Sequence, residues 1–268
     1  MKRALQKRSE KGFSLIEMMI AAVIFILLCG AAFALLSVAQ QRYQTESQVL
    51  NSFQEARFGL DDIIRDVNGS AYPAKNLFAF NPNLPFKNFY AITPLAWDPG
   101  YVANSPCIIG TTCTTPADFD LIIERDVDYW NTDGVEWVRY QLQGTTLSRA
   151  AVQKSATLGD PTSDTNPAFV PYVQNVMNNA SSAQITQFQT VYPQMFPGGN
   201  PVPVFSYFCY SPFGPPLPCP AAGSYNSPLN VTDVEITLIV MAPTKDAQTG
   251  QLRLIELHGR GHSLNPVQ

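Results

Sequence analysis

Residues 11–17, KGFSLIE, join a basic N-terminal segment to a long apolar run and place a single carboxylate, Glu17, near the start of that run. No further charge interrupts the run from Met18 to Leu36. An ionisable side chain in a segment of this kind costs on the order of 3 kcal/mol, and such side chains usually serve a function. The pattern therefore predicts a partner of opposite charge for Glu17.

The apolar run extends from Phe13 to about Ala39. As a helix it is long enough to cross the roughly 30 Å of hydrocarbon in a bilayer. Only one acidic residue, Glu10, offsets the basic residues in front of it, which are Lys2, Arg3, Lys7, Arg8 and Lys11. Because positive charge is retained on the cytoplasmic side, we expect one membrane span, with the residues after about 40 on the extracytoplasmic side.

An ordinary secretory signal also begins with basic residues and an apolar run. Cleavage at Gly30–Ala32 or at Ser37–Ala39 would then remove the whole segment. Two features argue against this reading: the run is longer than the usual apolar core of a signal peptide, and Glu17 has no role in one.

The segment from Gly12 to Glu17, followed by a long apolar helix, resembles the class III signal of type IV pilins and pseudopilins. The resemblance implies that a prepilin peptidase cleaves after Gly12 on the cytoplasmic side and methylates the new amino terminus, Phe13. The apolar segment then stays on the mature protein. Glu17 would be the fifth mature residue, and the resemblance implies that its carboxylate meets the amino terminus of a neighbouring subunit. Two opposite charges would thereby neutralise each other in an apolar environment.

Proline is absent before Pro73, which predicts one unbroken helix from about Ser14 to Val67. Its second half carries an apolar stripe at helical spacing, made of Val49, Phe53, Ala56, Leu60, Ile63 and Val67. Asn68-Gly69 supplies a stop signal. The expected organisation is a leader over 1–12, a transmembrane or filament-core helix over 13–39, an amphipathic half over 40–68 and an extracytoplasmic β-rich head over 69–268.

The rest of the chain is expected to form an antiparallel sheet with long loops. Alternating or apolar segments predict strands over 119–130, 135–140, 144–150, 185–192, 202–210, 231–241 and 252–258, with Phe169–Tyr172 as a short anchor. Asp133-Gly134 is a typical hairpin turn. The fold class is therefore α+β, a long N-terminal helix packed on a C-terminal antiparallel β domain.

This layout resembles the larger minor pilins of the PilW type and the related pseudopilin J of type II secretion. Many major pilins have a helix-disrupting proline in the apolar half, whereas this chain has none there. The resemblance implies a minor pilin that acts in initiation, assembly or the tip of a pilus, and alternatively a pseudopilus tip subunit. The implied partners are other major and minor pilins, the prepilin peptidase and the inner-membrane assembly platform, and the protein would pass from the inner membrane to the pilus.

The cysteines differ in their surroundings. Cys29 lies in the apolar run, while Cys107, Cys113, Cys209 and Cys219 lie in the exported part. Two close pairs in loops predict two local disulfides in an oxidising compartment, Cys107–Cys113 and Cys209–Cys219, although four cysteines allow three connectivities. A zinc site of all four thiolates is the alternative, but neither pair has the usual ligand spacing.

Other residues could bind a metal. His258 and His262 have a spacing that would suit ligation on a helix, but they follow a strand pattern and include two intervening glycines, so we expect exposed or capping histidines in a C-terminal tail. The acidic cluster Asp126, Asp128, Asn131 and Asp133 invites calcium but lacks the EF-hand register. We therefore predict no metal or other cofactor, with calcium as the open alternative.

Composition argues against two other classes of function. Residues 1–12 hold five of the 17 basic and one of the 21 acidic side chains, which leaves 12 basic and 20 acidic ones in the rest. An acidic body gives no support to a nucleic-acid interface. Catalytic motifs such as Gly-x-Ser-x-Gly or a phosphate-binding loop are missing from the sequence, so we predict a protein that is not an enzyme.

Overall fold

The computed structural model describes residues 12, 14–72, 95, 117–127, 135–153, 168–211, 214–219, 230–246 and 250–264. The chain divides into two compact units, Met1–Ser47 and Gln48–Gln268. A long helix, α1, begins in the first unit and ends in the second, and all the strands lie in the second. The observed class is α+β, as the sequence predicts.

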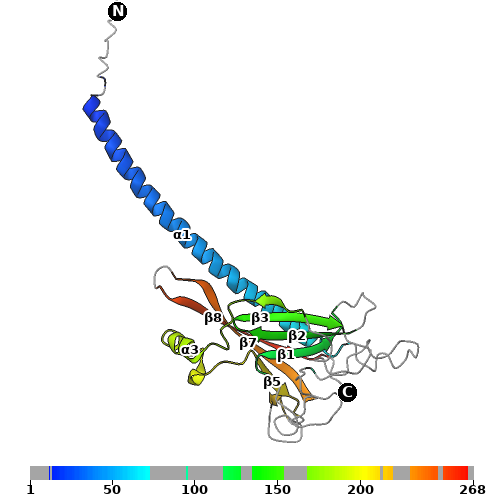
Figure 1. The fold of residues 1–268 in the computed structure, drawn as a ribbon. Coiled ribbons are helices and arrows are strands. Elements are labelled where there is room, and N and C mark those ends of the chain that lie inside the picture. The colour runs from blue at the N-terminus through cyan, green and yellow to red at the C-terminus, as the bar shows by residue number, and fades with distance from the viewer. Residues whose placement is uncertain are drawn as a thin grey trace, which may run out of the picture. The chain divides into compact units, whose positions relative to one another are not determined.

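Helix α1 spans Leu15–Asn68 without interruption, as Figure 1 shows in blue and cyan. Its length follows from the absence of proline, which would remove a backbone hydrogen bond in the helix interior. The helix ends where the amide of Gly69 bonds the carbonyl of Arg65 at 3.0 Å and the backbone of Ala71 turns to a positive φ of 60°. The predicted helix is therefore confirmed to within one residue at each end.

The first sheet has four antiparallel strands in sequential order: β1 (Asp120–Arg125), β2 (Glu136–Gln143), β3 (Thr146–Gln153) and β4 (Val170–Val173). Strands β2 and β3 form a hairpin across Gly144, whose φ of +60° favours glycine. Strand β4 includes Pro171 and lies at the sheet edge, where a missing backbone donor is tolerated. The segment expected only as a short anchor is thus an edge strand.

The second sheet also has four antiparallel strands, in the order β6-β5-β7-β8. They are β5 (Phe205–Cys209), β6 (Leu217–Pro218), β7 (Val231–Lys245) and β8 (Leu252–His262). The amide of Phe205 bonds the carbonyl of Asp118 at 3.0 Å, which ties the start of β5 to the chain just before β1. The sequence predicted one sheet; the structure has two, because strands far apart in the sequence pair within each sheet in ways that local alternation does not encode.

The apolar stripe on the second half of α1 packs into the main core. Ala56, Ile63 and Val67 are fully buried, and they cluster with strand residues of both sheets. Three glycines permit close packing. A Cβ added at Gly59 would lie 2.4 Å from Val173 of β4, and one at Gly259 or Gly261 of β8 would lie 2.4 or 2.5 Å from side chains of α1. Helix α1 therefore contacts the edge strands β4 and β8 where a side chain is missing.

A buried carboxylate, Asp66, holds α1 to the first sheet. It accepts hydrogen bonds from Arg125 of β1 at 2.7 Å, Tyr140 of β2 at 2.6 Å and Arg149 of β3 at 3.0 Å. Burial, followed by the nearby Asp66 carboxylate, raises the pKa of Tyr140, so its hydroxyl remains a donor. Burial lowers the pKa of Arg149, but Tyr140 and Asp66 raise it by more, so the guanidinium stays charged. One side chain of the helix thus contacts three successive strands.

Residues 185–192 were expected to be a strand, and this prediction is wrong. The structure has a short helix there, α3 (Ser182–Gln189). Ser181 and Gln184 form a capping box, in which each side chain bonds the backbone of the other residue. Ile185 and Phe188, three residues apart, face a second apolar cluster around Phe196 and Ile239. Alternation over a few residues suits a strand and a helix alike, and here the cap decides between them.

Candidate functional site

Gly12 and Ser14 lie just before α1, and both are exposed. A Cβ added at Gly12 would meet nothing within 4 Å. The fold itself therefore does not require glycine at this position. Phe13 and residues 1–11 lie outside the described residues, so the predicted new amino terminus is a matter of sequence alone.

Glu17 lies in the first turn of α1 and is exposed. Its Oε2 accepts a hydrogen bond from the backbone amide of Ser14 at 2.9 Å. This is the reciprocal half of a capping box, in which the acidic residue three positions after the cap satisfies the backbone amide of the cap. The sequence Ser14-x-x-Glu17 carries this signal, which the sequence prediction did not use. In the full-length chain Glu17 therefore has a local role in starting the helix.

The apolar part of α1 is exposed on all sides. From Leu15 to Gln40 every side chain is exposed except Cys29, which is half-buried. By length and composition the helix could cross a membrane, and none of its most apolar window is buried within the chain. Exposed leucine, isoleucine and phenylalanine at this density need a lipid or protein environment. The first unit thus presents an apolar helical surface with one carboxylate near its start.

Residues 7–33 match the family model of the prokaryotic N-terminal methylation motif. The match covers Gly12, Phe13 and Glu17 and most of the apolar run, and it is the motif that type IV pilin-like proteins share. No curated protein and no solved structure matches the chain. The chain therefore carries a type IV pilin-like N-terminal processing motif on a membrane-compatible helix.

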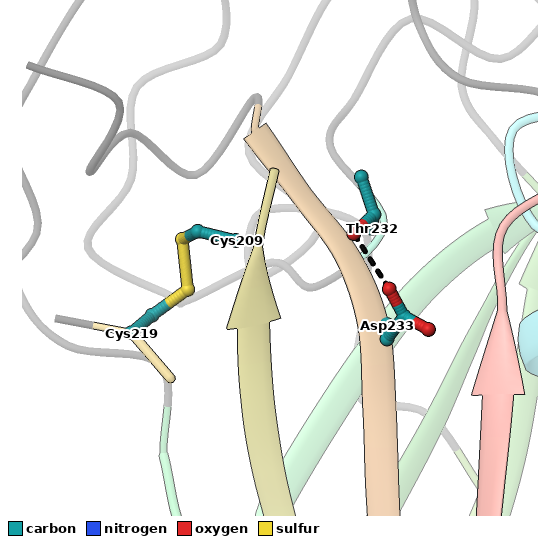
Figure 2. Close-up of a disulfide and its surroundings, with 4 residues drawn as sticks. All are labelled: Cys209, Cys219, Thr232 and Asp233. Atoms are coloured by element: carbon teal, nitrogen blue, oxygen red, sulfur yellow. Dashed lines mark hydrogen bonds between the residues drawn. A yellow bond between two sulfur atoms is a disulfide. The ribbon is translucent and has the colours of Figure 1, made fainter. Parts of the chain in front are cut away.

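The structure joins Cys209 at the end of β5 to Cys219 just after β6 in a disulfide (Figure 2). This is one of the two local pairs expected from the sequence. It closes a short loop between two paired strands, and the amide of Cys219 bonds the carbonyl of Tyr207 at 2.8 Å. Cys107 and Cys113 lie outside the described residues, so their pairing stays a prediction.

The two histidines lie within strand β8 and not in a C-terminal tail, which corrects that part of the prediction. Strand β8 continues four residues beyond the predicted end, because its register with β7 pairs Thr237 with His258 and Asp233 with His262. His258 Nδ1 lies 3.1 Å from Thr237 Oγ1, and His262 Nδ1 lies 3.2 Å from Asp233 Oδ1. Each histidine therefore has its own partner on β7, and in the described part of the chain no three acidic, histidine or cysteine side chains are grouped so as to hold a metal.

Asp233 is the most buried acid of the second sheet, with 8% of its side chain exposed. It accepts hydrogen bonds from Thr232 at 2.6 Å, drawn in Figure 2, and from Arg260 at 3.0 Å. Burial raises the pKa of this carboxyl, but the hydrogen bonds from Thr232, Arg260 and His262 lower it further, so the net shift is downward. Arg260 also lies over the Phe208 ring, 4.4 Å from its centre.

Most of the candidate calcium cluster, Asp128, Asn131 and Asp133, lies outside the described residues. Asp126 is described, and its backbone amide bonds the carbonyl of Tyr72 at 3.0 Å, which joins the end of β1 to the segment after α1. The ionic contacts of Asp66 were not predicted, because the residues that meet there are about 60 to 80 positions apart in the sequence and no local pattern brings them together.

Proposed function

We propose that this protein is a minor subunit of a type IV pilus, made as a precursor with residues 1–12 as its leader. A prepilin peptidase removes the leader after Gly12 and methylates Phe13. The helix then leaves the inner membrane and packs among the helices of other pilins, with the head on the outside of the filament. The subunit acts in initiation or at the tip of the filament.

One observation carries this proposal: the methylation motif over 7–33 is followed by an apolar helix that no part of the described head covers. Removal of the leader would create a positive charge at Phe13, four residues before Glu17. A neighbouring subunit can supply that charge to Glu17 and resolve the cost of a carboxylate at the edge of an apolar segment. The unbroken α1 favours a minor subunit over a bulk one.

Mass spectrometry of the mature amino terminus tests the proposal directly. We expect the full-length protein, isolated from membranes of cells that make a prepilin peptidase, to begin with N-methylated Phe13. A mature chain that begins after residue 32 or 39 would show an ordinary secretory signal and overturn the proposal. An uncleaved chain in those cells would overturn it as well.

Replacement of Gly12 separates recognition by the peptidase from folding. Because a Cβ at Gly12 meets nothing, Gly12→Val should leave the fold intact and block cleavage. We expect the variant to accumulate as an unprocessed membrane protein that fails to enter filaments. Gly30→Val is a matched control, since Gly30 also has open space around it, and its leader should be removed normally.

A further inference from the structure

Two pairs of opposite charges enclose the apolar surface of α1. No charged residue lies between Glu17 and Arg42. Once the leader is removed, the amino group of Phe13 precedes Glu17 by four residues, and Arg42 precedes Glu46 by four residues as well. Both pairs place the positive charge first, and Glu17, Arg42 and Glu46 are all exposed.

The two pairs share one face of the helix. Glu46 follows Glu17 by 29 residues, which is about eight turns, so the two carboxylates point within about 20° of each other around the axis. Phe13 and Arg42 are separated by the same interval and share a direction in the same way. All four positions belong to the unit Met1–Ser47, so the alignment depends only on the helix within that unit.

The face between the pairs alternates large and small apolar side chains. It carries Glu17, Ala21, Ile24, Leu28, Ala31, Leu35, Ala39, Arg42 and Glu46 in order. A parallel helix shifted by four residues, about 6 Å, would set its Ala31 level with Leu35 and its Leu35 level with Ala39. Small residues opposite large ones allow two helices to interdigitate.

We propose that α1 packs in parallel against the α1 of a second copy of this chain, with a four-residue offset that pairs Arg42 of one copy with Glu46 of the next. This rests on the proposed function, because the same offset sets the Phe13 amino group level with Glu17. Membrane insertion gives both copies the same orientation, so the helices are parallel. An offset contact is not symmetric, and its repetition extends a filament and does not close a dimer.

Pairing within one helix is the competing explanation for the spacing of Arg42 and Glu46. In a single helix, however, an acidic residue that precedes a basic one by four positions is the more favourable order. Here the basic residue comes first. An experiment must therefore distinguish a pair within one copy from a pair between copies.

A mixing experiment makes this distinction. The full-length, processed chain is labelled at its C terminus with a donor or an acceptor dye, and energy transfer measures its association in detergent micelles. Arg42→Glu makes positions 42 and 46 both negative, and Glu46→Arg makes both positive. Each variant alone should associate with itself about three- to ten-fold more weakly than the native chain. An equal mixture of the two restores opposite charges between copies but not within a copy, and its association should return to within about two-fold of the native value.

Glu55→Arg is the matched control, because Glu55 is exposed and neither Asn51 nor Gly59, four residues away on either side, is charged. It should associate as the native chain does. A native chain that does not associate with itself, or a mixture no stronger than the single variants, overturns the offset pairing. The mass of the amino terminus, measured on the same samples, keeps the two proposals apart: N-methylated Phe13 without rescue in the mixture overturns only the pairing, whereas a chain cleaved elsewhere overturns the proposed function.

Discussion

Glu17 has two interactions that one pair of substitutions can separate. Its carboxylate accepts the Ser14 amide, and its charge is available to an amino terminus. Glutamine can also accept that amide hydrogen bond, but it carries no charge. We therefore expect Glu17→Gln to keep the start of the helix, to be processed after Gly12 and to fail to enter filaments, as Glu17→Ala does. The measurement is the amount of each variant in sheared filaments relative to its amount in the membrane.

The contrary result is equally clear. If Glu17→Gln enters filaments at the native level while Glu17→Ala does not, the residue acts as a helix cap and not as half of an ion pair. Ser14→Ala serves as the control, because it changes the cap residue and leaves the charge at Glu17 in place. Its incorporation should stay near the native level.

Asp66 is a residue whose loss should affect the whole head. With 11% of its side chain exposed it neutralises two arginines, Arg125 and Arg149. Removing one member of a buried ion pair leaves the opposite charge uncompensated and costs about 3–5 kcal/mol. We expect Asp66→Ala to lower the free energy of unfolding by that amount in urea titrations of the full chain. Asp61→Ala, an exposed acid on the same helix, should change it by less than about 0.5 kcal/mol, and equal effects of the two variants would contradict the assigned role.

At the scale of elements, the contact between α1 and β8 depends on glycine. A Cβ at Gly261 would lie 2.5 Å from Val67 Cγ1 and 2.6 Å from its Cβ, on the fully buried stripe of the helix. The helix or the strand would have to move, and overpacking of this kind costs about 1–3 kcal/mol. Gly261→Ala should lower the midpoint of thermal unfolding accordingly. Gly214→Ala is the control, since its added methyl meets nothing, and a loss of stability there of the same size would argue against close packing as the cause.

The same contacts explain which elements the sequence could predict. Helix α1 was predictable because its cause is local, namely a proline-free run with an apolar stripe. The hairpin of β2 and β3 was predictable from alternation and a turn. The helix α3 was mistaken for a strand, although Ser181 and Gln184 carried a capping signal. The division into two sheets and the contacts of Asp66 could not be predicted, because they depend on pairings between residues that are distant in the sequence. For the N-terminal motif the sequence was sufficient, since a peptidase reads a short linear segment.

At the scale of the whole molecule, two carboxylates should make the stability of the head depend on pH in opposite directions. The pKa of Asp233 lies below its ordinary value of 3.8, since hydrogen bonds from Thr232 and Arg260 outweigh its burial. Its carboxylate therefore stabilises the fold above that value, and the contribution is lost as the pH falls through the folded-state pKa. Burial raises the pKa of Asp118, so its ionised form opposes folding at neutral pH, and protonation relieves this as the pH falls.

Urea unfolding of the full chain between pH 3 and pH 7 should show the two signs. Asp233→Asn should be less stable than the native chain at pH 7, and the difference should shrink toward pH 3 as the native carboxylate loses its charge. Asp118→Asn should be more stable at pH 7, and its advantage should also shrink toward pH 3. Because His262 contacts the same carboxylate, the Asp233 series is repeated in a His262→Asn background, where the trend below pH 5 should persist. A difference for Asp233→Asn that stays constant over the whole range would mean that its charge does not stabilise the folded head.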